Sequence, residues 1–280
     1  MFITNRHIVI TGAASGVGLG ITQYCLQNKA AQLVLVDCDF DTHHPLVDAA
    51  EKHVSVIILD IRDDSAVKAL SNKLSQQVPS IDMVINCAGV SGPFGAVWEV
   101  PKEQVDWTLE VNLMGTVNIA RHFLPLLHAS THDNPCFVSV SSHLGLVTKE
   151  HLFSYQMAKH AIVAFTEALK QDCQLSDPSI QLAIFFPYFV KSNLANSDRH
   201  LAKYQKHLYI ASGAKDFFQA IGTATDKGID PIEAAKILFD GLDNKAFYIF
   251  TDEKTLQEFK QRSDYIFENS NVATLIKHDH

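Results

Sequence analysis

Tyr155 and Lys159 stand four residues apart in the stretch SYQMAKHAIVAFTEALK, whose apolar spacing is that of a helix. One helical turn separates the two side chains, so they leave the same face of the helix. An ordinary phenol has a pKa of about 10, and a positive charge within about 6 Å favours its phenolate form. The pair therefore predicts a tyrosine that gives or takes a proton. The alternative is a packed tyrosine ring beside a lysine that reaches solvent.

A glycine-rich turn near the N-terminus is the second chemical signal. The stretch TGAASGVG places Gly12, Gly16 and Gly18 between an apolar run and a helical segment. Glycines let the backbone turn sharply, so that a pyrophosphate can approach the N–H groups at a helix N-terminus, where the dipole favours negative charge. The turn therefore predicts a dinucleotide-binding site.

Acidic residues follow the next two apolar runs. Asp37 lies 19 residues beyond Gly18, where a carboxylate can accept hydrogen bonds from the adenosine ribose and repel a 2′-phosphate. Cys38 and Asp39 come next, with no Arg or Lys beside them, so the pattern favours NAD over NADP. The alternative for Asp37 is a turn residue. Asp60 contacts the adenine edge or caps a helix, and the sequence leaves both interpretations open.

Seven short apolar runs alternate with helical segments and indicate the elements that position these residues. The runs are apolar throughout, which fits parallel strands covered on both faces, so we expect a doubly wound α/β sheet. The runs cover residues 7–11, 32–37, 54–60, 82–86, 136–141, 180–186 and 246–250. Helices are predicted over 17–28, 64–77, 102–129, 152–175 and 230–244, the last with Asp230 as N-cap and Pro231 at the first helical position.

Composition and length are those of one globular domain. The chain has 280 residues, 47% hydrophobic and 19% charged, and residues 191–228 have the Gly, Asn, Ser and Lys content of a flexible insertion without strand signals. A net charge of −8 without a basic run argues against a nucleic-acid groove. Five scattered cysteines without C-x-x-C and unclustered histidines support neither disulfides nor a metal site. With no leader-like segment and no apolar run near 18 residues, a soluble, cytoplasmic protein without a membrane partner is expected.

Motifs occur in a fixed order along residues 11 to 192, and five of them lie between residues 11 and 159. The chain has T-G-x-x-x-G-x-G from Thr11, an N-x-A-G with Asn86, Ala88 and Gly89, Asn112 in EVNLMGT, S-x-x-G as SHLG from Ser142, and Y-x-x-x-K from Tyr155. In these motifs the chain resembles the short-chain dehydrogenase/reductase family, in its compact single-domain branch. The resemblance implies a Rossmann-type sheet of about seven parallel strands, with residues 191–228 as a substrate lid over the cofactor.

The resemblance also implies catalytic roles. Of Ser139, Ser141, Ser142 and Ser154, only Ser142 opens S-x-x-G, and it lies thirteen residues before Tyr155 as the family pattern requires. Tyr155 is then the general acid/base toward a carbonyl or alcohol oxygen, and Ser142 hydrogen-bonds that oxygen. Lys159 lowers the pKa of Tyr155 and binds the nicotinamide ribose. Asn112 holds a water that links Lys159 to solvent, or it satisfies a kink in its helix.

One position departs from the family pattern. The usual P-G-x-V-x-T after the sixth strand reads PYFVKS here, with Tyr188 replacing the glycine. The ring is expected to form part of the substrate-site wall or to pack into the core. The cofactor contacts implied by the motifs and their neighbours are Gly12, Ser15, Gly16, Val17, Gly18, Asp37, Asp60, Ile61, Asn86, Ala88, Gly89, Tyr155, Lys159, Pro187, Val190 and Ser192.

The sequence says least about the substrate. Aromatic and apolar residues near the site favour an apolar or aromatic secondary alcohol or ketone, although lid aromatics can also simply attach a lid to the core. They are Phe94, Trp98, Leu194, Tyr204, Tyr209, Phe217 and Phe218. The predicted substrate contacts are Ser142, Tyr155, Tyr188 and Leu194.

The prediction is an NAD-linked oxidoreductase with a small-molecule substrate. NADP use, and a catalytically silent nucleotide-binding regulator or scaffold of the same fold, are the alternatives. By analogy with the family, the helices at 102–129 and 152–175 pair between subunits in a homodimer or homotetramer.

Overall fold

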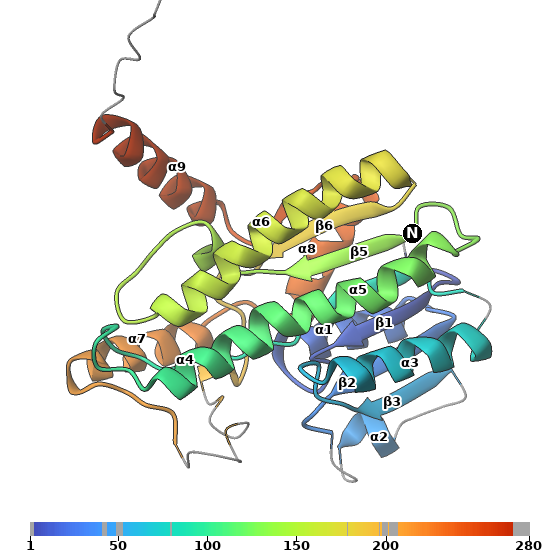
Figure 1. Ribbon diagram of the computed structural model, residues 1–280, viewed down its shortest axis with the longest axis horizontal. Coiled ribbons are helices and arrows are strands. Elements are labelled where there is room, and N and C mark those ends of the chain that lie inside the picture. Colours follow the sequence, from blue (N-terminus) through green and yellow to red (C-terminus); the bar gives the residue numbers. More distant parts are fainter. Residues whose placement is uncertain are drawn as a thin grey trace, which may run out of the picture.

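Seven parallel strands form one sheet in the order β3-β2-β1-β4-β5-β6-β7 (Figure 1). The computed structural model describes residues 3–40, 44–48, 53–78, 80–177, 179–195, 197, 201 and 207–270. The strands are β1 His7–Thr11, β2 Gln32–Asp37, β3 Val54–Ile58, β4 Met83–Asn86, β5 Cys136–Val140, β6 Gln181–Phe186 and β7 Tyr248–Phe250. The predicted parallel, doubly wound sheet is therefore confirmed, with β3 and β7 shorter than expected.

The strand order reverses direction between β1 and β4. The chain begins at β1, moves outward to β2 and β3, and then returns to place β4 on the other side of β1. In open sheets of this kind, ligands bind outside the carboxyl ends of the strands at such a switch point. The glycine turn after β1 and Gly89 after β4 both lie at this edge.

Helices cover both faces of the sheet. The helical elements are α1 Gly16–Gln27, α2 Pro45–Asp48, α3 Asp64–Gln77, α4 Lys102–Leu109, η1 Glu110–Met114, α5 Gly115–His128, η2 His143–Gly145, α6 Phe153–Ser176, η4 Ser212–Ala214, α7 Lys215–Asp226, α8 Pro231–Asp243 and α9 Glu253–Glu268. Figure 1 shows α3, α5 and α6 on one face and α1 and α8 on the other, while α9 projects from the body.

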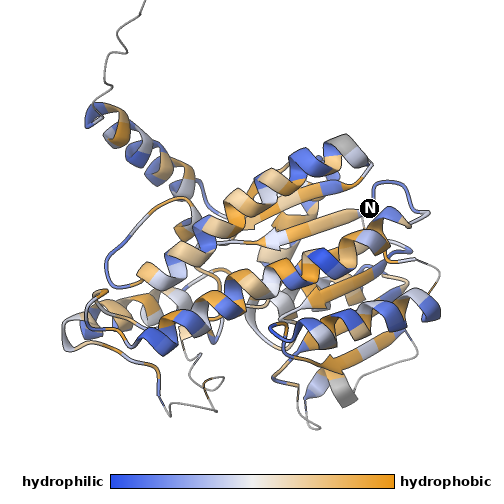
Figure 2. Ribbon diagram, viewed as in Figure 1, coloured by the Kyte–Doolittle hydropathy of each residue, from blue (hydrophilic) through white to orange (hydrophobic). Residues whose placement is uncertain are grey.

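Alternate residues of a strand enter different cores, which explains the continuous apolar runs. Ile8 and Ile10 of β1 pack in the core under α1 and α8, whereas Val9 between them packs in the core under α3 and α5. All three are fully buried, and the strands are accordingly apolar along their length (Figure 2).

Side-chain caps fix two helix starts. Asp230 accepts a hydrogen bond from Ile232 N at 2.9 Å with Pro231 in the first turn of α8, as predicted. Asp63 caps α3 by accepting from Ala66 N at 2.9 Å. The capping interpretation of Asp60 is therefore wrong, because Asp63 is the N-cap of α3.

Two helical features differ from the prediction. The helix expected over 102–129 contains a π-helical turn, η1, at Glu110–Met114. The second is α7, which lies inside the segment expected to be an insertion without regular structure. None of its residues is fully buried, although its apolar residues recur with helical spacing, a signal that the sequence interpretation did not use. Within the described chain, no helix is both long and apolar enough to cross a membrane.

Candidate active site

The turn between β1 and α1 has the geometry of a phosphate cradle. Gly12 has φ +69°, and a Cβ there would lie 2.7 Å from Ala88 N, so a side chain at this position is excluded. Ser15 at the N-cap of α1 makes no side-chain hydrogen bond to the helix in the described chain, and the first turn carries no acidic residue. The backbone N–H groups of this turn therefore suit a pyrophosphate, and the residues present fit a dinucleotide cofactor.

Asp37 stands beside the cradle at the end of β2. Its Oδ2 accepts a hydrogen bond from Ala14 N and its Oδ1 accepts one from Asp39 N, both at 3.0 Å. Asp37 is thus a turn residue and also lines a cavity of about 270 Å³. The turn interpretation of Asp37 is confirmed, and contact of the same carboxylate with a ribose stays a prediction.

Further carboxylates and one arginine line this cavity. Asp39 and Asp60 add negative charge, and Arg62, which the sequence interpretation did not use, lies at the same cavity. The predicted cofactor residues that line it are Ser15, Asp37, Asp60, Ile61, Ala88 and Gly89.

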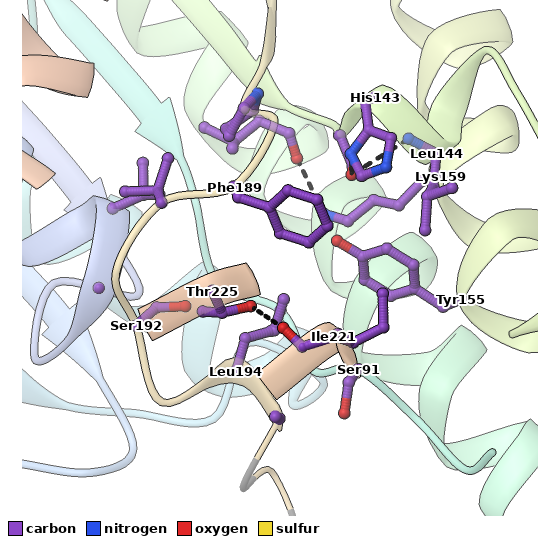
Figure 3. Close-up of a pocket in the computed structure, with 18 of the residues that line it drawn as sticks. Ser91, His143, Leu144, Tyr155, Lys159, Phe189, Ser192, Leu194, Ile221 and Thr225 are labelled. Carbon is purple, nitrogen blue, oxygen red and sulfur yellow. Dashed lines mark hydrogen bonds between the residues drawn. The ribbon is translucent and has the colours of Figure 1, made fainter. Parts of the chain in front are cut away.

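A second cavity, of about 170 Å³, adjoins the first. Ser15 and Gly89 line both, so the two form one elongated site. The predicted residues that line the second are Gly12, Ser15, Gly16, Val17, Gly89, Ser142, Tyr155, Lys159, Pro187, Tyr188, Val190, Ser192 and Leu194. In Figure 3, Tyr155 and Lys159 stand side by side from α6, and Ser192 and Leu194 lie on the opposite side of the cavity.

Three predicted residues line neither cavity. Gly18 packs α1 onto the turn, since a Cβ there would lie 2.0 Å from Gly12 O. Asn86 accepts from Thr11 Oγ1 and donates to Thr116 Oγ1, both at 2.8 Å, which ties β4 to β1 and α5. Asn112 is the third. Direct cofactor contact is therefore not supported for Gly18 and Asn86, which brace the wall from behind.

Ser142 is the serine that faces Tyr155. Ser142 lies close enough to the Tyr155 hydroxyl to lower the pKa of that group, and Ser142 Oγ accepts a hydrogen bond from Leu144 N at 3.2 Å. The competing serines are engaged elsewhere: Ser139 accepts from Thr166 Oγ1 at 2.8 Å, and Ser141 donates to Lys159 O at 3.0 Å. Ser154 is fully buried and lines neither cavity.

Lys159 and Asn112 meet beside Gly89. A Cβ on Gly89 would lie 3.0 Å from Asn112 Oδ1 and 3.6 Å from Lys159 Nζ. Asn112 Nδ2 donates to Val90 O at 2.9 Å and its Oδ1 accepts from Val90 N at 2.8 Å, while Lys159 Nζ donates to Val140 O at 2.9 Å. The side-chain amide of Asn112, in η1, is therefore hydrogen-bonded to the loop after β4 and holds that loop in place.

Burial controls the protonation of the pair. It raises the pKa of Tyr155 from 10.0 to about 12, partly offset by the hydrogen bond with Ser142. It lowers the pKa of Lys159 from 10.5 to about 8. The expected lowering of the tyrosine pKa is therefore wrong in this structure, because burial disfavours the charged phenolate by more than its neighbours favour it.

Tyr188 contributes to the wall of the second cavity. Its ring centroid lies 4.4 Å from that of His143 and 4.8 Å from that of Phe189, and all three residues line the cavity. Burial lowers the pKa of His143 to about 4, so its imidazole is neutral at pH 7. The ring of Tyr188, at the position of the family glycine, thus forms an aromatic wall with His143 and Phe189 next to Ser142.

Two of the apolar residues that the sequence analysis named, Phe94 and Leu194, line the second cavity, whereas Tyr209, Phe217 and Phe218 do not. Phe218 packs on Phe94 with centroids 4.9 Å apart, and Phe217 packs on His151 at 5.7 Å, so these rings attach the lid to the body. Trp98 is 84% exposed, and Tyr204 lies outside the described residues. Further apolar side chains that line the cavity include Leu144, Leu152, Phe189 and Ile221.

Sequence reasoning missed several lining residues, and Figure 3 shows two of them, Ile221 and Thr225, projecting from α7. Their four-residue spacing was the available signal. Phe189 follows Tyr188 inside a motif that the sequence already marked.

Residues 6–202 match the sequence profile of the family described as short chain dehydrogenase. The chain is a member of the short-chain dehydrogenase family. It is an oxidoreductase that depends on a nicotinamide cofactor, NAD or NADP.

Individual members of this family resemble the chain over most of its length. A "CLA biosynthesis dehydrogenase/reductase" of Lactiplantibacillus plantarum is 28% identical over 88% of both chains. The crystal structure of a short-chain dehydrogenase/reductase from Burkholderia phymatum in complex with NAD has a TM-score of 0.88 and 24% identity, covering 98% of both chains. One from Burkholderia cenocepacia J2315 in complex with NADP has a TM-score of 0.72 and 19% identity, covering 97% of this chain and 100% of that one. These structures share the fold of this short-chain dehydrogenase.

Proposed function

We propose that the protein transfers hydride between NAD and an uncharged, apolar secondary alcohol or ketone, with Tyr155 as the general acid/base. The observation that carries the proposal is the meeting of Ser142, Tyr155 and Lys159 in a cavity continuous with the glycine turn after β1. A silent scaffold of the same fold is the competing function. Retention of all three side chains in one cavity argues against it.

The chain's own residues would handle the proton and the oxygen. In reduction, Tyr155 Oη donates a proton to the carbonyl oxygen, and Ser142 Oγ hydrogen-bonds the same oxygen as negative charge develops. A pKa of about 12 keeps Tyr155 protonated at neutral pH, which suits a general acid. Oxidation follows the reverse path and gains from alkaline conditions. When bound, the nicotinamide cofactor supplies or accepts the hydride.

Predicted residues that line the two cavities would hold the cofactor. The first turn of α1 and Gly12 would take the pyrophosphate, and Asp37 the adenosine ribose. Lys159 would bind the nicotinamide ribose, and Pro187, Val190 and Ser192 would line the nicotinamide end.

NAD is favoured over NADP by the charge near Asp37. The first cavity, which would hold the adenosine half of the cofactor and is called the adenosine cavity below, is lined by the carboxylates of Asp37, Asp39 and Asp60. Its one guanidinium, that of Arg62, forms an ion pair with Asp60. A 2′-phosphate would add about two negative charges to this surface, so like-charge repulsion opposes it.

An uncharged substrate fits the lining of the second cavity. Among the described residues that line it, Lys159 is the one Lys, Arg, Asp or Glu side chain, and the proposal already assigns it to the cofactor. Most of the other lining residues are apolar or aromatic. A substrate carboxylate would therefore be desolvated without a partner.

Residues 191–228 would act as the substrate lid. Ser192, Leu194, Ser197, Ile221 and Thr225 from this segment line the cavity opposite Tyr155. The middle of this segment is attached to Gln104 of α4, whose Nε2 donates to His207 O at 3.1 Å and whose Oε1 accepts from Tyr209 N at 2.9 Å.

The cofactor proposal is tested by titrating the protein with NADH and NADPH and following nicotinamide fluorescence. We expect tighter binding of NADH, and a smaller difference in Asp37→Asn, which removes the charge but keeps one acceptor oxygen for the turn. Equal affinities in the wild-type protein would refute the preference. Binding of neither nucleotide would bring the scaffold function forward.

The substrate proposal is tested with a matched pair of ketones, acetophenone and 4-acetylbenzoate, which differ by one carboxylate. We expect kcat/KM for acetophenone to be at least about tenfold higher, because burying an unpaired carboxylate disfavours the transition state. Equal or faster turnover of the acid would sink the uncharged-substrate assignment.

A further inference from the structure

The adenosine cavity contains an arginine to which the proposed function gives no role. Arg62 lies in the turn between β3 and α3, and its Nε is 3.1 Å and 2.9 Å from the two carboxylate oxygens of Asp60. Its Nη2 is 2.5 Å from Asp60 Oδ2, and its backbone N donates to Asp60 Oδ1 at 3.0 Å. The guanidinium is therefore pinned in one orientation.

The other end of the guanidinium points toward a second element. Arg62 Nη1 lies 3.9 Å from Glu110 Oε2 in η1, and Val111, which follows Glu110, lines the cavity together with Trp107. Arg62 thus reaches from the strand side of the cavity to its helix side. The hydrogen bond with Asp60 raises the pKa of Arg62, so the group stays charged.

A planar cation has a specific use in a cavity of this composition. The carboxylates of Asp37, Asp39 and Asp60 accept hydrogen bonds but cannot stack on a ring. A guanidinium stacks on aromatic faces, and bases are bound in this way in nucleic-acid grooves. In a nicotinamide dinucleotide, the planar ring attached to the ribose at Asp37 is adenine.

We propose that Arg62 forms the outer wall of this cavity and stacks its guanidinium plane on the adenine ring of the cofactor. The inference rests on the proposed function in taking this cavity as the adenosine half of the dinucleotide site. Asp60 acts as a positioning residue that fixes the plane of the guanidinium. Stacking gives affinity for adenine without distinguishing NAD from NADP, which stays with Asp37.

The test compares ligands that contain adenine with one that does not. AMP carries the adenosine half, reduced nicotinamide mononucleotide carries the other half, and NADH carries both. Binding of AMP is read from tryptophan emission in a Trp98→Phe background, because Trp107 then is the single tryptophan of the chain and lines this cavity. NADH and the mononucleotide are read from nicotinamide fluorescence.

Two variants distinguish the effect of the planar guanidinium of Arg62 from the effect of its positive charge. Arg62→Met keeps an unbranched stem and removes both, whereas Arg62→Lys keeps the charge and loses the plane. We expect both variants to bind AMP and NADH roughly tenfold more weakly, as loss of one stacked base predicts, with unchanged affinity for the mononucleotide. Arg121→Met, on the exposed face of α5 away from both cavities, is the matched control and should change nothing.

Other outcomes overturn the inference in distinct ways. Full affinity in Arg62→Lys would mean that charge, not stacking, holds the nucleotide. Unchanged AMP binding in Arg62→Met would leave Arg62 as a surface ion pair only. Equal weakening of the mononucleotide would indicate a general disturbance of the site. Failure of the wild-type protein to bind any of the three ligands would refute the proposed function itself, and the inference with it.

Discussion

At the scale of single residues, the site depends on how burial sets charge. Tyr155 is 7% exposed and Lys159 is 4% exposed, so each side chain is shifted toward its neutral form. A protonated phenol is what reduction of a carbonyl requires, whereas a buried ammonium destabilises the fold. Both residues therefore support the proposed function, and Lys159 also lowers the stability of the protein.

Replacing Tyr155 by Phe tests the proposed proton transfer. We expect turnover to fall by about 10²-fold to 10⁴-fold, the usual contribution of a general acid, while the affinity for NADH stays within about twofold. The measurement is kcat at saturating cofactor, together with an NADH titration. Tyr248→Phe is the control, because this hydroxyl donates to Glu167 Oε1 at 2.8 Å far from either cavity. Unchanged turnover in Tyr155→Phe would move the proton to another group.

Replacing Lys159 by Met tests the stability effect of burial. The lowered pKa corresponds to about 3 kcal/mol of destabilisation at pH 7, and the variant loses one hydrogen bond to Val140 O. We therefore expect an inactive protein whose free energy of unfolding is roughly 2 kcal/mol higher.

The pH dependence of the higher free energy of unfolding of Lys159→Met shows whether the lowered pKa of Lys159 causes it. Between pH 8 and 10.5 the unfolded chain holds a proton on Lys159 that the folded chain has released, so wild-type stability rises with pH across this window. The advantage of Lys159→Met should be complete below pH 8 and lost near pH 10.5. Urea unfolding of both proteins at several pH values measures it. A gain that does not vary with pH would assign the effect to packing instead.

At the scale of elements, η1 and the loop after β4 are fastened to each other. Asn112 occupies the π-helical turn and makes two buried hydrogen bonds to the backbone of Val90. This arrangement holds Gly89 where both cavities meet. The irregular turn in the helix therefore positions the wall of the site.

Replacing Asn112 by Leu should release this attachment. The change leaves Val90 N–H and C=O buried without partners, which costs about 2–4 kcal/mol in the free energy of unfolding. Asn112→Asp keeps the acceptor for Val90 N and should lose less. Urea unfolding measures both, and NADH affinity should fall in the same order. Equal stability of the Leu variant and the wild-type protein would show that the loop is held by other contacts.

Elements and motifs with a regular spacing could be predicted from the sequence. Features that depend on contacts between residues far apart in the chain could not. The strands, the glycine turn and the order of Ser142, Tyr155 and Lys159 follow from periodicity and motif spacing. The helix α7 was missed although its apolar residues recur with helical spacing, whereas Arg62 gave no signal because its place depends on Asp60 and η1 together. The pKa of Tyr155 had the wrong sign because burial is a property of the fold.

At the scale of the whole molecule, the exposed apolar residues bear on self-association. Met114 of η1 and Met157 of α6 are 49% and 46% exposed, on helices that lie on the same face of the sheet (Figure 1). Phe267 is 79% exposed on α9, which projects from the body. Large exposed apolar side chains are enriched where subunits meet, so the two regions offer different interfaces.

Glutamate substitutions distinguish these regions. The family analogy predicts a homodimer or homotetramer through α5 and α6. The double variant Met114→Glu/Met157→Glu should then shift the mass measured by sedimentation velocity toward that of the monomer. The reason is that two carboxylates would be buried without partners at that contact. Phe267→Glu is the matched control and should leave the assembly intact. Dissociation by Phe267→Glu alone would assign the contact to α9 instead. A monomeric wild-type protein at micromolar concentration would contradict the analogy altogether. NADH affinity should stay the same in every variant, because none of the three residues lines either cavity.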